Sequence, residues 1–192
     1  MDIVKKNIGK GEKIMSTHAS RNTSTGLIFE EDTPINQIFG FLGEEALMFA
    51  SDNEKAKRTG LKNWRNVVNN LPNVQYEGIG NGKRPSFWSK NYIPDGVIIH
   101  NNTLYIIEKK FQKCVGTADA KLSEGSFRLN RFALLKKYLP YKISNVKYLF
   151  ILGEWFKKSE YKDRIEYERE NNHNIEFMFY DENPPYKFFG VD

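Results

Sequence analysis

The amino-acid sequence predicts an α/β domain built in three layers, with helices flanking a central mixed β-sheet. The chain has 192 residues, a length that favours one domain over two. Apolar residues make up 40% of the chain and aromatic residues 14%, which is enough to bury a sizeable core. The order of helical and extended patterns along the chain then selects the class.

Helices and strands are predicted from the spacing of apolar residues. These recur every three or four positions in a helix, and at alternate positions or in short Ile- and Val-rich runs in a strand. Helices are predicted at residues 34–51, 61–71, 118–139 and 154–171, and strands at 73–77, 93–100, 103–111, 145–152 and 174–180. Two helices therefore precede a β-meander, after which helix and strand alternate. This order is typical of a mixed sheet with helices packed against it.

The beginning of the chain differs in composition from the rest. Residues 1–26 are polar and rich in Ser, Thr, Asn, Lys and Gly, so they contain too little apolar surface to pack on their own. We expect a flexible polar arm there, followed by a single domain over residues 27–192.

Cysteine content and hydropathy argue against several classes of protein. The one cysteine, Cys114, has no partner for an internal disulfide, and no CxxC pair is present for zinc. No stretch approaches the ~20 apolar residues needed to span a membrane, and the N-terminus lacks an apolar run of signal-peptide length. We expect a soluble cytoplasmic protein with no membrane partner. The formal net charge of +5 suits a polyanionic partner.

The strands at 93–100 and 103–111 are separated only by Asn101-Asn102. Asparagine tolerates positive φ, which both central residues of a tight hairpin turn require. A two-residue turn here pairs His100 with Thr103 and fixes every other pair in the hairpin.

Counting back from that turn places Asp95 opposite Glu108. Because side chains alternate between the two faces of a strand, Glu108 and Lys110 share one face, and Asp95 joins them there. Lys109 points to the other face. Two carboxylates directly opposite each other repel and destabilise a plain hairpin.

A divalent cation between the two carboxylates would remove this repulsion. Mg²⁺ is usually held by one or two carboxylates together with water and substrate phosphate oxygens, and it polarises the phosphoryl group. A neighbouring amine such as Lys110 can orient the attacking water or neutralise charge that develops on the phosphate. Asp95, Glu108 and Lys110 are thus the residue types that phosphodiester hydrolysis needs on one face.

Pro94-Asp95 followed by Glu108-x-Lys110 resembles the signature of the PD-(D/E)xK nuclease superfamily, which includes many type II restriction endonucleases, junction resolvases and repair nucleases. The likeness in element order covers roughly residues 30–180, and the motif itself is four residues. The resemblance implies a restriction-endonuclease-like core with Asp95 and Glu108 as metal ligands, Lys110 as the catalytic lysine and Mg²⁺ as the cofactor.

Members of this superfamily often add an acidic metal ligand from an upstream helix. Glu30 is the favoured candidate for this third ligand, because Thr25-Gly26-Leu27-Ile28-Phe29-Glu30 resembles such an entry to a helix. Glu44 and Glu45, which follow Gly43, remain alternatives.

Basic residues and a polar helix start surround the motif in the sequence. The loop 78–91 combines glycines, which allow close backbone approach, with basic side chains that can meet phosphates or guanine edges. The helix at 118–139 carries an excess of basic residues and begins near a threonine that can cap it, which leaves backbone N–H groups for a phosphate. The residues expected to contact DNA are Lys83, Arg84, Gln112, Thr117, Lys121, Arg128 and Arg131.

The resemblance implies a metal-dependent deoxyribonuclease that uses no nucleotide cofactor. We expect a type II restriction endonuclease that cleaves double-stranded DNA as a homodimer, because a palindromic site mirrors a two-fold symmetric protein. The loop 78–91 and the arm 1–26 resemble added recognition elements, which favours this reading. A structure-selective nuclease of the resolvase or repair type is an alternative, and so is a DNA-binding module without catalytic activity.

Overall fold

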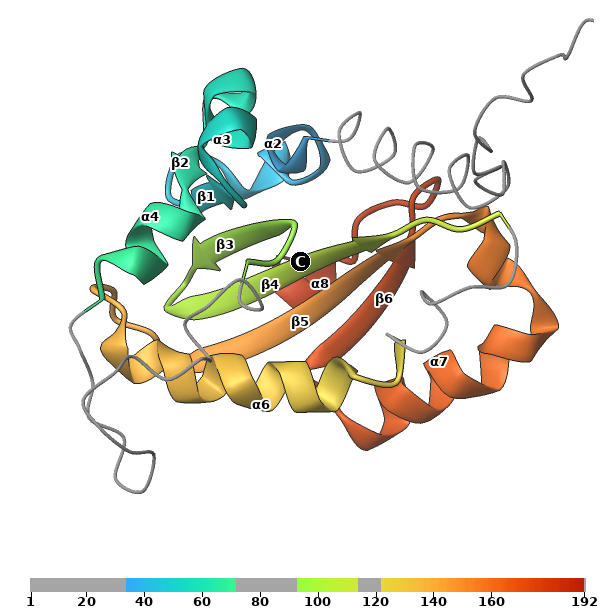
Figure 1. Cartoon of the computed structure of the whole chain (residues 1–192). Helices are drawn as coiled ribbons and strands as arrows, with labels where there is room; N and C mark the ends of the chain where they lie inside the picture. The colour runs from blue at the N-terminus through green and yellow to red at the C-terminus, as the bar shows by residue number, and fades with distance from the viewer. Residues whose placement is uncertain (1–33, 72–92, 114–121, 192) are drawn as a thin grey trace, which may run out of the picture.

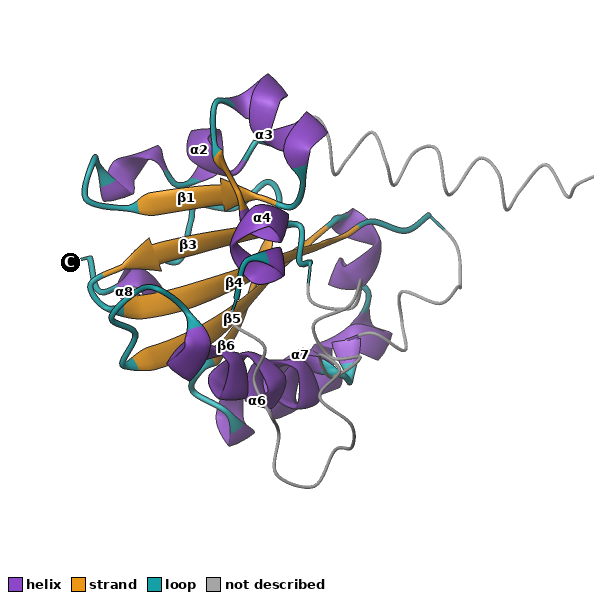
Figure 2. Ribbon diagram, turned by 60° about the vertical axis from the view of Figure 1, so that its left-hand side comes forward, coloured by secondary structure: helices purple, strands orange, loops and turns teal. Residues whose placement is uncertain are grey.

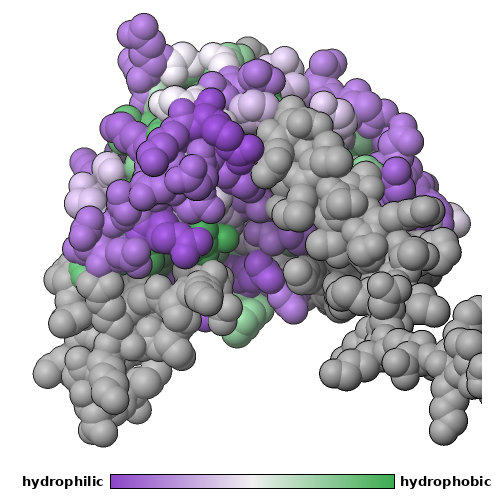
Figure 3. Space-filling model, turned by 45° about the horizontal axis from the view of Figure 1, so that its top comes forward, coloured by the Kyte–Doolittle hydropathy of each residue, from purple (hydrophilic) through white to green (hydrophobic). Residues whose placement is uncertain are grey.

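The computed structural model describes residues 34–71, 93–113 and 122–191 (Figure 1). The predicted arm at 1–26 and the predicted strand at 73–77 lie outside these residues. None of the described helices is both long enough and apolar enough to cross a membrane. On the side drawn in Figure 3, hydrophilic residues dominate the described surface, as expected where the apolar side chains are packed inside.

Six described strands form one mixed sheet in the order β2-β1-β3-β4-β5-β6. Neighbouring strands are antiparallel in the pairs β1–β3 and β3–β4, and parallel in β1–β2, β4–β5 and β5–β6. Figure 2 shows β1, β3, β4, β5 and β6 side by side in this order. The strands are β1 (Leu47–Ala50), β2 (Lys62–Asn63), β3 (Gly96–His100), β4 (Thr103–Lys110), β5 (Asn145–Leu152) and β6 (Ile175–Phe179).

Helices cover both faces of this sheet. One face packs against α4, α6 and α7, and the other packs against α2, η1 and α8 (Figure 1). The predicted class, an α/β domain with a mixed sheet flanked by helices, is therefore confirmed. The described helices are α2 (Ile35–Ile38), η1 (Gly40–Leu42), α3 (Asn53–Thr59), α4 (Trp64–Asn69), α6 (Gly125–Leu135), η4 (Lys136–Tyr138), η5 (Glu154–Lys157), α7 (Ser159–Asn171) and α8 (Tyr186–Phe189).

The central strand β4 divides its side chains between two hydrophobic cores. Leu104 and Ile106 pack in the core under α6, whereas Tyr105 and Ile107 pack in the core under α8. Side chains alternate along a strand, so even-numbered residues of β4 face α6 and odd-numbered ones face α8. This parity decides where the charged residues that end the strand are directed.

Aromatic rings fill much of both cores. Phe150 and Phe177 stack on the α6 side with ring centroids 5.0 Å apart. On the α8 side Tyr105 stacks on Phe189 at 4.5 Å, and its hydroxyl donates a hydrogen bond of 3.2 Å to the Phe189 carbonyl. Burial of such rings provides a large share of the hydrophobic stabilisation of a domain.

The prediction of one helix over residues 34–51 is wrong. The segment forms α2 and η1, turns at Gly43 with φ of 71°, and then enters the sheet as β1. A glycine in the left-handed region ends a helix readily. The run Leu47–Ala50 is apolar on consecutive positions, a pattern that periodicity alone cannot assign to helix or to buried strand. β1 pairs with β3 in antiparallel register.

The other predicted elements that lie within the described residues agree with the structure apart from their ends. The helices α3 and α8 were not predicted, and the short strand β2 lies where the start of a helix was predicted. The strand predicted at 145–152 matches β5, and those at 93–100, 103–111 and 174–180 contain β3, β4 and β6. The helix predicted at 61–71 begins only at Trp64, because the Asn63 side chain caps it by accepting a hydrogen bond of 3.1 Å from the Asn66 N–H. The helix predicted at 154–171 is divided into η5 and α7, and the described part of 118–139 contains α6 and η4.

Candidate active site

The hairpin turn between β3 and β4 has the predicted conformation. Asn101 and Asn102 have φ of 48° and 56°, as both central residues of a type I′ turn require. The register runs from His100 opposite Thr103 to Gly96 opposite Ile107. The predicted pairing of the two strands is confirmed.

Asp95 directly precedes β3 and lies beside the end of β4. One of its oxygens, Oδ2, accepts a hydrogen bond of 2.7 Å from the backbone N–H of Lys109. This bond continues the hairpin by one more residue and brings the carboxylate next to Glu108. By the alternation described above, Asp95, Glu108 and Lys110 are directed to the α6 face, whereas Lys109 is directed to the α8 face.

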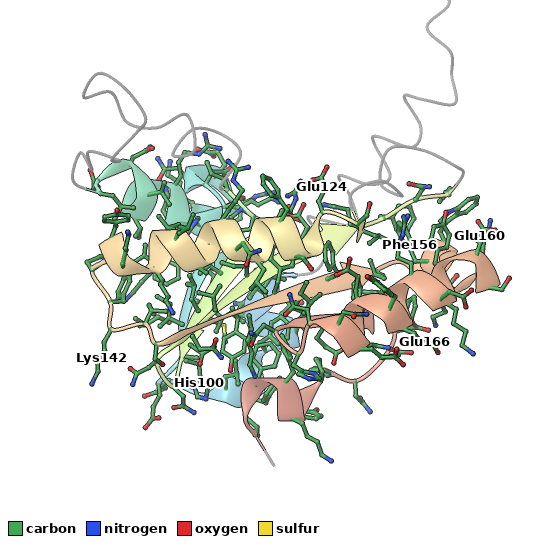
Figure 4. The ribbon with its side chains drawn as sticks, turned by 90° about the horizontal axis from the view of Figure 1, so that it is seen from below. His100, Glu124, Lys142, Phe156, Glu160 and Glu166 are labelled. Atoms are coloured by element: carbon green, nitrogen blue, oxygen red, sulfur yellow. The ribbon has the colours of Figure 1, made fainter. Side chains whose placement is uncertain are left out.

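The site lies at the edge of the sheet where β4, β5 and β6 end. Because these strands are parallel, their carboxyl ends meet at one edge, and α6 begins above it. Figure 4 shows the two ends of the sheet, with His100 and Lys142 toward one and Glu124, at the start of α6, toward the other. The candidate site is thus at the end of the hairpin far from its turn.

Glu108 is the centre of a buried cluster of charges. Its Oε1 accepts a hydrogen bond from Lys110 Nζ, and the side chains of both residues are only 10% exposed. Arg128 reaches the same oxygen from the first turn of α6, with its Nη1 at 3.4 Å. Arg128 also pairs with Glu124, whose Oε2 lies 3.0 Å from the guanidinium Nε. Glu108 Oε1 therefore interacts with two cationic side chains, those of Lys110 and Arg128.

Asp95 is the electrostatically strained member of the cluster. Burial raises the pKa of its carboxyl group, and the nearby charge of Glu108 raises it further. The charge of Lys110 and the hydrogen bond from the Lys109 backbone oppose this shift without cancelling it. A buried carboxylate next to another one is a costly arrangement unless positive charge is added.

The Arg128 guanidinium stays charged beside Glu108. Burial alone lowers the pKa of Arg128, but its interactions with Tyr148 and Glu108 outweigh burial, so the net pKa is raised. Tyr148, on β5, is completely buried, and burial followed by the charge of Glu108 raises the pKa of its hydroxyl well above the ordinary value. The nearby positive charge of Arg128 opposes this shift without cancelling it.

The two carboxylates have oxygens left over that suit a divalent cation. Asp95 uses Oδ2 for the Lys109 N–H, and Glu108 uses Oε1 for its two cations. The second oxygen of each carboxylate, Asp95 Oδ1 or Glu108 Oε2, takes part in none of these contacts. Mg²⁺ needs only one or two carboxylates when water and phosphate supply the remaining ligands, so this donor set fits it.

A third acidic ligand is not supplied by the part of the chain that the structure describes. No group of three His, Cys, Asp or Glu side chains there is placed to hold a metal. Glu44 and Glu45 are exposed and precede β1, whose first residue Leu47 pairs with Ile99. Ile99 is four residues from Asp95, or about 13 Å along the strand at about 3.3 Å per residue, so neither acid reaches the site. Glu30 lies outside the described residues.

The residues predicted to contact DNA differ in where they lie in the structure. Lys83, Arg84, Thr117 and Lys121 lie outside the described residues. Gln112 is buried rather than on the surface. Arg128 is directed toward Glu108, and the Arg131 guanidinium lies over the exposed ring of Phe127, 5.2 Å from its centroid. Of the described candidates, Arg131 is thus the one whose charge lies on the outer side of α6.

Two members of the cluster were not recognised from the sequence. The pairing of Arg128 with Glu108 joins residues 20 positions apart and depends on how α6 packs, which apolar periodicity does not reveal. Tyr148 pairs with Ile106 across β4 and β5. The available signal was a tyrosine inside an otherwise apolar strand, since a buried tyrosine usually needs a polar neighbour.

The arrangement brings two carboxylates, an amine and a guanidinium together at one edge of the sheet. No protein-family model, curated protein or solved structure matches this chain. The chemistry of these side chains is therefore the basis for a functional proposal.

Proposed function

We propose that this protein is a metal-dependent endonuclease that hydrolyses phosphodiester bonds of DNA. The observation that carries the proposal is the placement of Asp95 beside Glu108 on the α6 side of one hairpin, with Lys110 hydrogen-bonded to Glu108. These are the three residue types that a Mg²⁺-assisted phosphodiesterase needs, gathered at the end of a sheet and not dispersed over its surface.

Asp95 and Glu108 are the residues that would hold the cation. When bound, Mg²⁺ supplies Lewis-acid polarisation of the scissile phosphate. Its charge also relieves the repulsion that raises the pKa of Asp95. A bound divalent cation would thus offset the unfavourable electrostatic energy of two neighbouring buried carboxylates.

Lys110 is the catalytic residue of the proposed site. Without the cation its ammonium group compensates the charge of Glu108. During catalysis the same group would orient the attacking water and stabilise negative charge on the phosphate oxygens. Arg128 is a positioning residue, because it holds Glu108 from α6 and is itself held by Glu124.

The topology supports a restriction-endonuclease-like core. The antiparallel strands β1, β3 and β4 are followed by α6 and then by β5, which is parallel to β4. A meander, a helix and a further strand are the order that the PD-(D/E)xK resemblance implies. On this basis we infer a type II restriction enzyme that cleaves double-stranded DNA as a homodimer.

The test is incubation of the protein with phage and plasmid DNA in Mg²⁺ or in EDTA. Wild-type protein is expected to give discrete fragments in Mg²⁺ and none in EDTA. Lys110→Ala is expected to lose cleavage and to keep DNA binding in a gel-shift assay. Lys142→Ala is the matched control, because Lys142 is an exposed lysine at the opposite end of the sheet (Figure 4).

The other outcomes separate the alternatives. Cleavage of branched DNA alone would identify a structure-selective nuclease instead of a restriction enzyme. Binding without cleavage under any metal condition would identify a DNA-binding module. Cleavage by Lys110→Ala at the wild-type rate would contradict the proposed catalytic site.

A further inference from the structure

A cavity of about 560 Å³ opens directly beyond the end of β4. Three aromatic side chains, Phe111, Trp155 and Tyr180, line it, and each belongs to the segment that follows a different parallel strand. The rest of the lining consists of Gln112, Lys113, Gly153, Glu154 and Asp181. The cavity therefore occupies the same edge of the sheet as the candidate active site.

The position of the Phe111 ring depends on the backbone of the neighbouring segment at Gly153. The N–H of Gly153 donates a hydrogen bond of 2.9 Å to the Lys110 carbonyl, which joins the segments that follow β4 and β5. A Cβ atom on Gly153 would lie 2.9 Å from Phe111 Cδ2, closer than carbon atoms normally approach. Glycine at this position thus leaves the space that the Phe111 ring occupies.

The second wall, Trp155, is also held in place. Its indole N–H donates a hydrogen bond of 2.8 Å to the Tyr161 hydroxyl. The ammonium group of Lys158 lies over the indole ring, 3.1 Å from its centroid. The third wall, Tyr180, follows β6 directly, and its N–H donates to the Leu152 carbonyl at 2.9 Å. The Trp155 side chain and the backbone of Tyr180 are therefore held in place.

Cations surround these rings. Lys113 Nζ lies 5.9 Å from the centroid of the Phe111 ring, and Lys157 Nζ lies 2.5 Å from Oδ2 of Asp181, which lines the cavity. Aromatic faces bordered by lysines suit a planar ring attached to a phosphate, because the ring stacks and the phosphate meets the ammonium groups. Carboxylate and amide groups such as Asp181 and Gln112 can hydrogen-bond to the edge of a base.

We propose that this cavity binds one unstacked nucleobase of the DNA strand held at Asp95, Glu108 and Lys110, an inference that rests on the proposed nuclease function. Phe111 follows Lys110 in the chain, and the cavity lies at the same edge of the sheet as the candidate active site, so a DNA strand bound at that site runs close to the cavity. A base inside a duplex is covered by its neighbours. The enzyme therefore extrudes that base or acts where it is already unpaired.

The experiment measures binding of fluorescein-labelled oligothymidylate by fluorescence anisotropy in EDTA. A second probe of the same length is fully abasic, so it keeps the phosphates and lacks the bases. Wild-type protein is expected to bind the oligothymidylate more tightly than the abasic probe. Tyr180→Ala is expected to weaken oligothymidylate binding about fivefold or more, the usual effect of losing one stacking ring, and to leave the abasic probe unaffected.

Tyr167→Ala is the matched control, because Tyr167 is another exposed tyrosine and lies on α7 away from the cavity. Gly153→Ala tests the same cavity by displacing Phe111 and is expected to reduce the difference between the two probes. The inference is overturned if wild-type protein binds both probes equally, or if Tyr180→Ala and Tyr167→Ala bind the oligothymidylate as the wild type does.

Binding in EDTA is independent of cleavage, so the two proposals fail separately. Ring-dependent binding by a protein that never cleaves DNA would leave the base site standing and remove the nuclease. If the protein cleaves DNA but Tyr180→Ala does not change oligothymidylate binding, the proposed base site is contradicted and the proposed nuclease function is not.

Discussion

The two ends of the β3–β4 hairpin differ in what stabilises them. At the turn, Asn101 and Asn102 are exposed and adopt positive φ, so local backbone conformation decides the structure. At the open end, Asp95, Glu108 and Lys110 are charged side chains placed in a mostly buried setting. The turn sets the register of the two strands. This register brings the charged side chains together at the open end, where their burial is energetically unfavourable. A slip of one residue at the turn would move every side chain to the other face.

The open end is balanced by interactions that a divalent cation could replace. Glu108 is paired with Lys110 and Arg128, whereas Asp95 accepts a hydrogen bond from the Lys109 N–H. Substitutions at this end should therefore change both activity and electrostatic stability. Substitutions at the turn should change stability alone.

The largest effect is expected for Glu108→Ala. Removal of the carboxylate leaves Lys110 and Arg128 as neighbouring buried cations without their shared partner, which typically costs about 3–5 kcal/mol. Urea unfolding measures the loss, and cleavage should disappear as well. Glu108→Gln keeps the shape of the side chain and should cost less. Equal stability of Glu108→Ala and wild type would show that the ion pairs contribute nothing.

Lys110→Ala is expected to lower the cleavage rate by about 10²–10³-fold, as loss of a group that stabilises transition-state charge commonly does. The rate is measured by single-turnover cleavage of a fragment that the wild type cuts. The unfolding temperature of the variant, measured in parallel, shows whether it remains folded. A variant that is folded and fully active would break the link between the open end and catalysis.

At the turn, Asn102→Ala is expected to destabilise the protein by about 1–2 kcal/mol, because alanine is disfavoured in the left-handed region. Asn102→Gly should cost nothing there. Neither change touches Asp95 or Glu108, so cleavage per folded molecule should equal that of the wild type. Loss of activity in folded Asn102→Gly would mean that the two ends are not separable in this way.

Asp95→Asn is expected to raise the stability of the metal-free protein by about 0.2–1 kcal/mol at neutral pH, because it removes a repulsive pair, and to abolish cleavage. The folded pKa of Asp95 lies above its ordinary value of 3.8, so the folded state holds a proton that the unfolded state has released. Wild-type stability therefore falls as pH rises from 3.8 through the folded pKa.

Asp95→Asn has no titrating carboxyl group at this position, so its stability lacks this pH dependence. The stability difference between Asp95→Asn and the wild type should therefore grow as pH rises from 3.8 through the folded pKa of Asp95. Urea unfolding at several pH values in EDTA measures the difference. Parallel pH profiles for the two proteins would show that Asp95 titrates normally.

What the sequence could predict depended on how local the controlling interaction is. The turn at Asn101-Asn102 and the strand β5 follow from short-range rules, and both match the structure. The faces of Asp95, Glu108 and Lys110 followed from the same turn by counting. These features needed only backbone preferences and alternation.

The features that the sequence did not predict depend on packing between distant segments. β1 is a strand because it completes the sheet beside β3, although its apolar run fits a helix equally well. The contact of Arg128 with Glu108 and the burial of Tyr148 require α6 and β5 to be in place. The aromatic cavity likewise combines segments that follow three different strands.

The most direct measurement of the central claim is thermal unfolding of wild-type and Asp95→Asn protein during titration with Mn²⁺, a divalent ion that prefers oxygen ligands. A ligand that binds only the folded state raises its stability by RT ln(1 + [L]/Kd). If a cation binds between Asp95 and Glu108, the unfolding temperature of the wild type should rise with Mn²⁺ concentration, and that of Asp95→Asn should not change. Equal shifts in both proteins, or no shift in the wild type, would contradict the account.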